Sequence, residues 1–272
     1  TRKDKISVGI DRKKQVIVSS DFLHEMIVSA FLSQFTKRKN VIVKDYNLNF
    51  LSYDGYAVCK TKRKRVTESK AYILMEKLGS QKDLKVKGTV LNDLIKMGKI
   101  NTHKIIKNLT FQLFIYIYCL QKNFKGVHYD LHFGNVGYIP ISSDIKWLLY
   151  KVGDKNYYLP NTGYLYKLFD FDNSVINYGN YSFYNLKLRQ KKYVKEINIS
   201  INFQPGYDIA HVIGSIIESL FFGRDGEKIK AKNTRELDSI LIFLLAMVKS
   251  MMKEMKKKFD IGLDTRKKII VS

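Results

Sequence analysis

Residues 102–122, with the sequence THKIIKNLTFQLFIYIYCLQK, are the part of the chain whose pattern restricts the fold most. Apolar residues recur at helical spacing, and the length of the stretch favours one helix despite its β-branched and aromatic residues. The apolar runs at 109–120, which Gln112 interrupts, and at 240–248 are too short to span a bilayer. We therefore expect a soluble protein with a long apolar helix and no transmembrane segment.

The rest of the chain predicts a mixture of strands and helices. Strands are expected at 6–10, 16–19, 41–43, 56–59, 71–76 and 164–171, a β-hairpin at 147–160, and helices at 21–35, 208–222 and 234–258. Residues 176–203 are aromatic and basic without a clear period. Strands mostly precede helices, which favours an α+β protein with two lobes.

The charge balance is strongly basic. The 272 residues include 48 Lys and Arg against 25 Asp and Glu, which gives a net charge of +23. Such an excess favours contact with nucleic acid, phosphate groups or an anionic membrane surface. The densest runs, KTKRKR at 60–65 and KEMKKK at 253–258, are equally well explained as solvated faces or a charged loop.

The two cysteines, Cys59 and Cys119, have neither the spacing of a metal site nor that of a disulfide framework. Each is most simply a small buried apolar residue. No signal peptide is visible in the sequence. We therefore expect a reducing compartment.

Polar residues gather in the stretch GVHYDLHFGNVGY at 126–138, where His128, Asp130, His132 and Asn135 lie among apolar residues. A second acidic position, Asp170 in LFDFDN, directly follows an expected strand. Carboxylate and amide oxygens in this arrangement suit Mg²⁺, which also takes substrate phosphate oxygens. Phosphoryl transfer needs such a metal and a carboxylate that orients the attacking hydroxyl.

These motifs resemble the catalytic loop and the metal-binding motif of the protein-kinase superfamily. His128-Tyr129-Asp130-Leu131 with Asn135 is similar to H-x-D-L-x-x-x-N, and Asp170-Phe171-Asp172 is similar to the Asp-Phe-Gly motif. The run LPNTGYLYKLFDFDNSV looks most like the serine/threonine kinases of nucleocytoplasmic large DNA viruses. The resemblance implies a bilobal kinase-like fold, with a small or truncated β-rich N-lobe at 1–76. The C-lobe at 77–272 would be mainly helical with a β-hairpin insertion.

The resemblance also implies roles for individual residues. Asp130 would orient or deprotonate the substrate hydroxyl, and Asn135 and Asp170 would bind Mg²⁺ or Mn²⁺. Glu25 takes the place of the helix C glutamate, and Asp208 that of the aspartate that braces the catalytic loop. ATP would lie against Met75, Glu76 and Leu78 and would be gripped by Lys5, for which Lys13 and Lys14 are alternatives.

The sequence also departs from the family pattern. No Gly-rich phosphate-binding loop is visible, and Asp172 replaces the glycine of Asp-Phe-Gly, where backbone freedom is needed. Tyr129 replaces the usual arginine. His132 stands where protein kinases have a phosphate-contacting lysine, and it would either touch phosphate or cap the loop. His128 is expected to be a buried scaffold residue, and Trp147 to be a packing residue.

The function that the resemblance implies is a protein serine/threonine kinase that transfers the γ-phosphate of ATP, located in the host cytoplasm or the virion. One alternative is a pseudokinase or structural virion protein that contacts nucleic acid or other virion components through its basic surface. Another alternative is a small-molecule phosphotransferase, because D-L-H loops also occur in that group.

Overall fold

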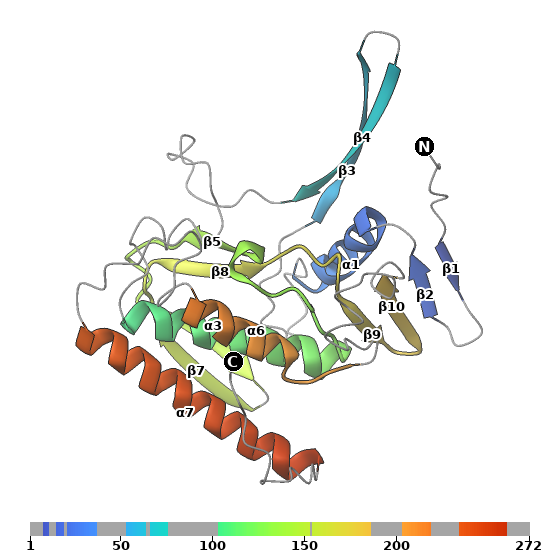
Figure 1. Ribbon diagram of the computed structural model, residues 1–272. Helices are drawn as coiled ribbons and strands as arrows, with labels where there is room; N and C mark the ends of the chain where they lie inside the picture. Colours follow the sequence, from blue (N-terminus) through green and yellow to red (C-terminus); the bar gives the residue numbers. More distant parts are fainter. Residues whose placement is uncertain are drawn as a thin grey trace.

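The computed structural model of the chain is a mixed α+β fold (Figure 1). It describes residues 8–10, 15–18, 21–36, 53–63, 66–75, 103–152, 154–185, 203–218 and 234–259. The helices among these residues are α1 (Asp21–Thr36), α3 (His103–Phe124), α6 (Tyr207–Ile217) and α7 (Thr234–Phe259), with a short 3-10 helix η1 (Phe133–Asn135). The α+β class expected from the sequence is confirmed, while the division into two kinase lobes at residue 76 stays a prediction.

Helix α3 is the centre of the hydrophobic core. It begins one residue after the predicted start and ends two residues beyond the predicted end, and its buried side chains include Leu109, Leu113, Ile117 and Leu120. Residues from α1, α6 and α7 pack into the same core. None of the described helices is long and apolar enough to cross a membrane.

Gln112, the polar residue inside the apolar run, is buried in a hydrogen-bonded network. Its amide nitrogen donates to Asn108 at 2.7 Å and to the Tyr164 carbonyl at 3.1 Å, and its oxygen accepts the Tyr116 hydroxyl at 3.0 Å. The same oxygen accepts the backbone N–H of Tyr166 at 3.1 Å. Because buried polar groups are costly unless they are paired, this network fixes the position of the following strands on α3.

Four strands form the largest described sheet, in the order β1-β2-β10-β9. They are β1 (Val8–Ile10), β2 (Gln15–Val18), β9 (Val175–Tyr178) and β10 (Tyr181–Asn185). Strand β2 pairs in parallel with β10, so a strand from the predicted N-lobe joins strands from the predicted C-lobe. The sequence missed β9 and β10, although the two-residue turn Gly179-Asn180, with φ 58° at Gly179, is a hairpin signal.

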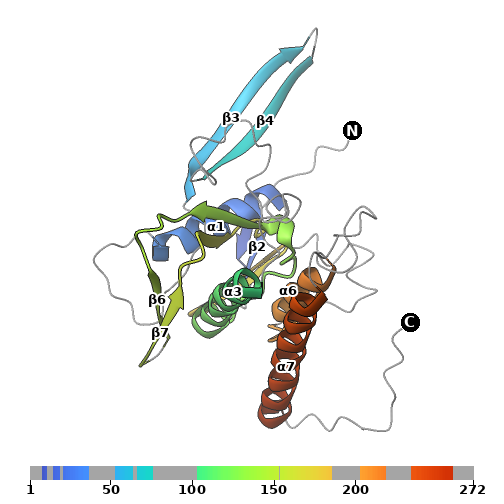
Figure 2. The same cartoon turned by 90° about the vertical axis from the view of Figure 1, so that its left-hand side faces the viewer.

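The hairpin of β3 (Tyr53–Arg63) and β4 (Val66–Met75) projects away from the other elements in both ribbon views (Figures 1 and 2). Both strands are longer than the sequence predicted. Residues 60–63 of the basic run form the last part of β3, and residues 64 and 65 lie outside the described residues. The expected strand at 41–43 lies outside the described residues.

Between α3 and α6, the described residues form two further strand pairs besides β9 and β10. Strand β5 (Val136–Pro140) pairs with β8 (Tyr164–Leu168), and β6 (Trp147–Val152) pairs with β7 (Lys155–Pro160) in the hairpin that the sequence predicted. Strand β8 ends at Leu168, so the acidic motif begins just beyond the strand and not inside it. The packing role expected for Trp147 is wrong, because 57% of this residue is exposed.

Candidate active site

The backbone of the segment at 126–135 is held by hydrogen bonds to Asp208, which lies in the first turn of α6. This fully buried carboxylate accepts the backbone N–H of His128 at 2.8 Å and that of Tyr129 at 3.0 Å. Burial raises the pKa of Asp208 to about 6, against the opposing effect of the two hydrogen bonds. The hydrogen bonds hold Tyr129 at φ 64°, a conformation that costs a bulky residue about 1–3 kcal/mol.

His128 connects this loop with the acidic motif. Its ring is fully buried, its Nε2 donates to the Phe169 carbonyl at 2.9 Å, and it lies 4.7 Å from the ring of Phe171. Burial lowers the pKa of His128 to about 4, so the imidazole is neutral at physiological pH. A neutral ring that donates to a carbonyl orients the backbone and is poorly placed to act as a general base.

Asp130 is the accessible carboxylate of the loop, with 36% of its side chain exposed. Its Oδ2 accepts a hydrogen bond from the Asn173 amide at 3.2 Å. The Asn135 amide nitrogen donates to the Asp130 carbonyl at 2.8 Å and lies 3.5 Å from Oδ2. Because the nitrogen of Asn135 faces Asp130, the amide oxygen is the atom of Asn135 that remains for a cation.

His132 caps the short helix η1. Its Nδ1 accepts the backbone N–H of Gly134 at 2.9 Å, and its Nε2 lies 3.8 Å from Oδ1 of Asp130. Of the two roles considered for His132, the loop-capping one is therefore present in the structure. The side chain is 32% exposed beside Asp130, which leaves Nε2 accessible from solvent.

The acidic motif at 169–174 lies directly against the loop. The backbone N–H of Phe169 donates to the Asn135 carbonyl at 3.2 Å, so the two segments run side by side. Asp170 has φ 65°, a left-handed conformation that Asp tolerates better than most residues. Phe171 is buried in the core, which positions the neighbouring residues Asp170 and Asp172 at the surface of the protein body.

Helix α1 brings Glu25 to the same place. His24, the residue before it, is buried and its Nε2 donates to the Ser174 carbonyl at 2.9 Å. At the start of the helix, Asp21 accepts the Asn185 amide at 2.6 Å. Burial, together with the smaller effect of the charges of Asp170 and Asp172, raises the pKa of Glu25 to about 7. These three carboxylates therefore interact with one another.

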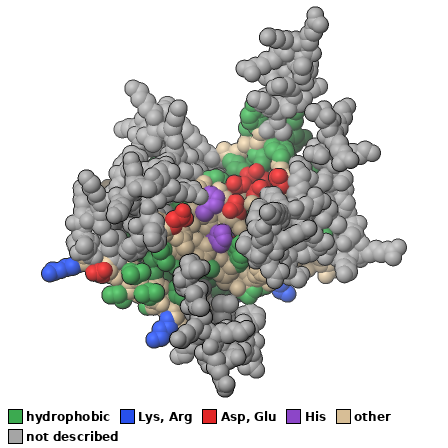
Figure 3. Space-filling model, viewed as in Figure 1, with side chains coloured by type: hydrophobic (Ala, Val, Ile, Leu, Met, Phe, Trp, Pro, Cys, Tyr) green, Lys and Arg blue, Asp and Glu red, His purple; other side chains and the backbone are tan. Residues whose placement is uncertain are grey.

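The space-filling view shows acidic side chains and histidines gathered in the middle of one face (Figure 3). Among the described residues, no three His, Cys, Asp or Glu side chains are placed to hold a metal ion together. Asn135 and Asp170, which lie on the two adjacent segments, carry side-chain oxygens of the kind that Mg²⁺ prefers. This ion is usually held by one or two protein side chains and completes its shell with water and substrate phosphate.

The structure thus brings Asp130, Asn135, Asp170 and Glu25 into one region, with His132 at its rim. Met75 is the last residue of β4 and is partly buried. Lys5, Glu76 and Leu78 lie outside the described residues, as do Lys13 and Lys14. The lysine partner of Glu25 and the adenine-binding segment therefore stay predictions.

Sequence reasoning assigned no role to Asn173 and none to His24. Asn173 follows Asp172 directly and donates to Asp130, so its place in the motif LFDFDN was a usable signal. His24 had no such signal, because its partner Ser174 is 150 positions away. His211, also unassigned, stacks on Tyr207 with ring centroids 4.8 Å apart.

Comparison with known proteins gives no match, either to a protein-family model or to a curated relative.

Proposed function

We propose that this protein is an ATP-dependent phosphotransferase that transfers the γ-phosphate to serine or threonine hydroxyl groups of proteins. The observation that supports this proposal best is the pairing of Asp130 with Asn135 and Asn173 beside the acidic motif. This arrangement presents the accessible carboxylate of Asp130 next to the side-chain oxygens of Asn135 and Asp170. Phosphoryl transfer depends on this combination of a positioned carboxylate and a cation site.

In this proposal, Asp130 orients the attacking hydroxyl and accepts its proton. The hydrogen bond from Asn173 and the contact with Asn135 restrict the rotamer of Asp130, and such positioning supplies much of the rate enhancement. The Asn135 oxygen and the Asp170 carboxylate would hold Mg²⁺ or Mn²⁺. The chemistry that the bound cation supplies is neutralisation of the phosphate charge.

The nucleotide would lie between these residues and the end of β4. Met75, Glu76 and Leu78 would contact the adenine, and Lys5 would bridge Glu25 and the phosphates, as the family resemblance implies. A cation beside Glu25 would lower the raised pKa of this carboxyl group. Binding of the nucleotide with its metal near neutral pH should therefore release a proton from Glu25.

One observation favours a second candidate, a kinase-like protein that binds nucleotide without transferring phosphate. Asp172 stands at the glycine position of the metal motif and contributes to the cluster of carboxylates around Glu25. This additional charge changes the electrostatics at the position where the family pattern has no side chain. The two candidates share nucleotide binding and differ in phosphate transfer.

A thermal-shift titration of the full chain with ATP, in the presence of Mg²⁺ or Mn²⁺, tests the shared step. Saturating ligand should stabilise the protein, by about 2.7 kcal/mol at a concentration 100 times the Kd. Asp170→Asn should reduce the shift, whereas Asp144→Asn, at an exposed position on the β5–β6 loop, should not. The absence of any shift in the unaltered protein would contradict both candidates.

A further inference from the structure

The outer face of the β6–β7 hairpin is apolar and exposed. Trp147 is 57% exposed, Leu149 46% and Tyr158 63%. Leu149 and Tyr158 are directly paired across the hairpin, and Trp147 is paired with Pro160, so all four side chains belong to the same face. Figure 2 shows the hairpin at the margin of the molecule, with α3 on its inner side.

The inner face of the hairpin already makes the packing contacts. Tyr150 is buried and its hydroxyl lies 3.1 Å from that of Tyr116 on α3. The Asn108 amide donates to the Pro160 carbonyl at 2.6 Å, and Leu148 and Leu159 pack against the core. The hairpin is therefore fixed on α3, and its outer aromatic residues are not needed for the core. Exposed apolar patches of this kind commonly mark binding surfaces.

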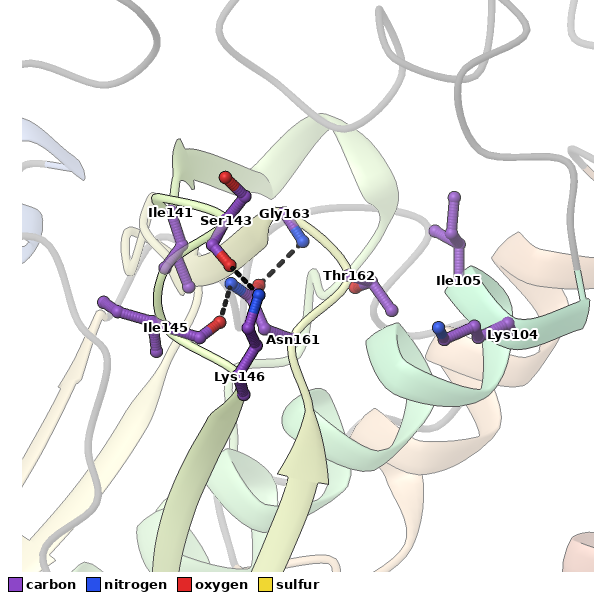
Figure 4. Close-up of a pocket in the computed structure, with 9 residues that line it drawn as sticks. All are labelled: Lys104, Ile105, Ile141, Ser143, Ile145, Lys146, Asn161, Thr162 and Gly163. Atoms are coloured by element: carbon purple, nitrogen blue, oxygen red, sulfur yellow. Dashed lines mark hydrogen bonds between the residues drawn. The ribbon is translucent and has the colours of Figure 1, made fainter.

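A pocket of about 510 Å³ opens at the base of the hairpin (Figure 4). Lys104 lines it from α3, and Lys146 lines it from the loop before β6. The Lys146 ammonium group donates to the Ser143 carbonyl at 3.1 Å, which holds this charge at the rim. Ile145, the residue next to Lys146, also lines the pocket and is 47% exposed, and Trp147 of the apolar face follows Lys146 directly in the chain.

Positive charges lie at both ends of this face. Lys104 and Lys146 are at the pocket, and the exposed Lys151 lies near the hairpin turn on the same face as Trp147 and Leu149, whereas Lys155 is paired with Val152 on the inner face. The nearby exposed acids are Asp144 and Asp154, and Asp144 already accepts the Ser142 hydroxyl at 3.0 Å. Three lysines against two aspartates give a local excess of +1, of the same sign as the +23 of the whole chain.

We propose that this surface, formed by Trp147, Leu149, Tyr158 and the Lys104–Lys146 pocket, binds single-stranded nucleic acid. Aromatic side chains stack unpaired bases, while lysines along the path contact the phosphates. Trp147 and Tyr158 are diagonal neighbours on one face, about 7–8 Å apart, which suits neighbouring nucleotides of one strand. Base stacking on exposed rings requires unpaired bases, so a duplex is not the expected ligand. This inference does not depend on the proposed phosphotransferase activity.

The chain has a single tryptophan, so its fluorescence reports directly on this surface. Titration of the full chain with a short oligothymidylate should quench the Trp147 emission, and the affinity should fall steeply as salt rises. Tyr158→Ala should weaken binding about 5- to 150-fold, because loss of one stacked base costs about 1–3 kcal/mol. Lys146→Gln should reduce the slope of log affinity against log salt by about 1.

Two variants separate stacking from other causes. Tyr158→Leu keeps an apolar side chain and must also weaken binding if the ring is responsible. Tyr181→Ala removes another exposed tyrosine, which lies on β10 and is 46% exposed, and must leave the affinity unchanged. The thermal unfolding midpoint of each variant shows whether the fold is retained.

Three results would overturn the proposal. One is binding of a duplex of the same length with equal or higher affinity. Another is an unchanged affinity in both Tyr158→Ala and Tyr158→Leu. The third is Trp147 emission that responds to protein concentration and not to the oligonucleotide, which would assign this face to contact between copies of the chain.

Discussion

The carboxylate of Asp208 accepts the backbone N–H of His128 at 2.8 Å, although the two residues are 80 positions apart. Its other oxygen accepts the next amide, that of Tyr129, so a single buried side chain fixes two consecutive peptide groups. His128 in turn donates to the Phe169 carbonyl. Three distant segments of the chain are thereby held in one arrangement, which determines where Asp130 points.

Replacement of Asp208 by asparagine should destabilise the protein by about 1–3 kcal/mol. The amide keeps one acceptor oxygen but turns an NH₂ group toward a backbone N–H, which leaves a buried donor unpaired. Urea unfolding of Asp208→Asn against the unaltered protein measures the change. An unchanged unfolding midpoint would show that these two hydrogen bonds do not support the loop.

A glycine pair offers a matched test of the packing between α3 and the loop. A Cβ on Gly126 would lie 2.9 Å from both Ile176 Cδ1 and Leu120 Cγ, so Gly126→Ala should cost about 1–3 kcal/mol through overpacking. A Cβ on Gly214, which is exposed on α6, meets no atom within 4 Å. Gly214→Ala should therefore stabilise the protein by about 0.5–1 kcal/mol. Equal effects of the two substitutions would contradict this packing.

The pH dependence of stability should reveal the position of Glu25. Its pKa is raised from 4.5 to about 7 in the folded state, so the folded protein binds more protons than the unfolded chain between these values. The contribution of Glu25 to stability is therefore lost as the pH rises from about 4.5 to about 7. Between pH 5 and pH 8, the Tm of Glu25→Gln should fall less than that of the unaltered protein. Identical pH profiles would contradict the raised pKa of Glu25, and with it the burial of this carboxyl group beside Asp170 and Asp172.

The sequence predicted those elements whose pattern is local. Helix α3 and the β6–β7 hairpin agree with the expected ranges within two residues, because helical spacing and turn residues are encoded over short distances. The parallel pairing of β2 with β10 joins residues more than 160 positions apart, and no local pattern specifies such a partner. For the same reason, the contact of His24 with Ser174 was not predictable.

The surroundings of Trp147 show another limit of sequence patterns. Both faces of the β6–β7 hairpin carry apolar residues, so alternation along the strand does not indicate which face is buried. The contacts of Asn108 and Tyr116 on α3, together with the packing of Leu148 and Leu159 against the core, select the inner face. In the candidate site, the motif residues were recognisable from their spacing, and the family resemblance implied that Asp208 braces the loop, but the role of Asn173 as a hydrogen-bond partner required the fold.

Transfer of labelled γ-phosphate from ATP to a protein substrate tests the central proposal most directly. The full chain, with Mg²⁺ or Mn²⁺, should label serine or threonine residues of a general substrate or of the chain itself. Asp130→Asn should lower the rate by about 10²–10⁴-fold while nucleotide binding and the Tm are retained, because it removes only the acceptor of the hydroxyl proton. Asp170→Asn should lower both transfer and metal-dependent binding, and Asp144→Asn should change neither. Full transfer activity in purified Asp130→Asn or Asp170→Asn would contradict the assignment of this site.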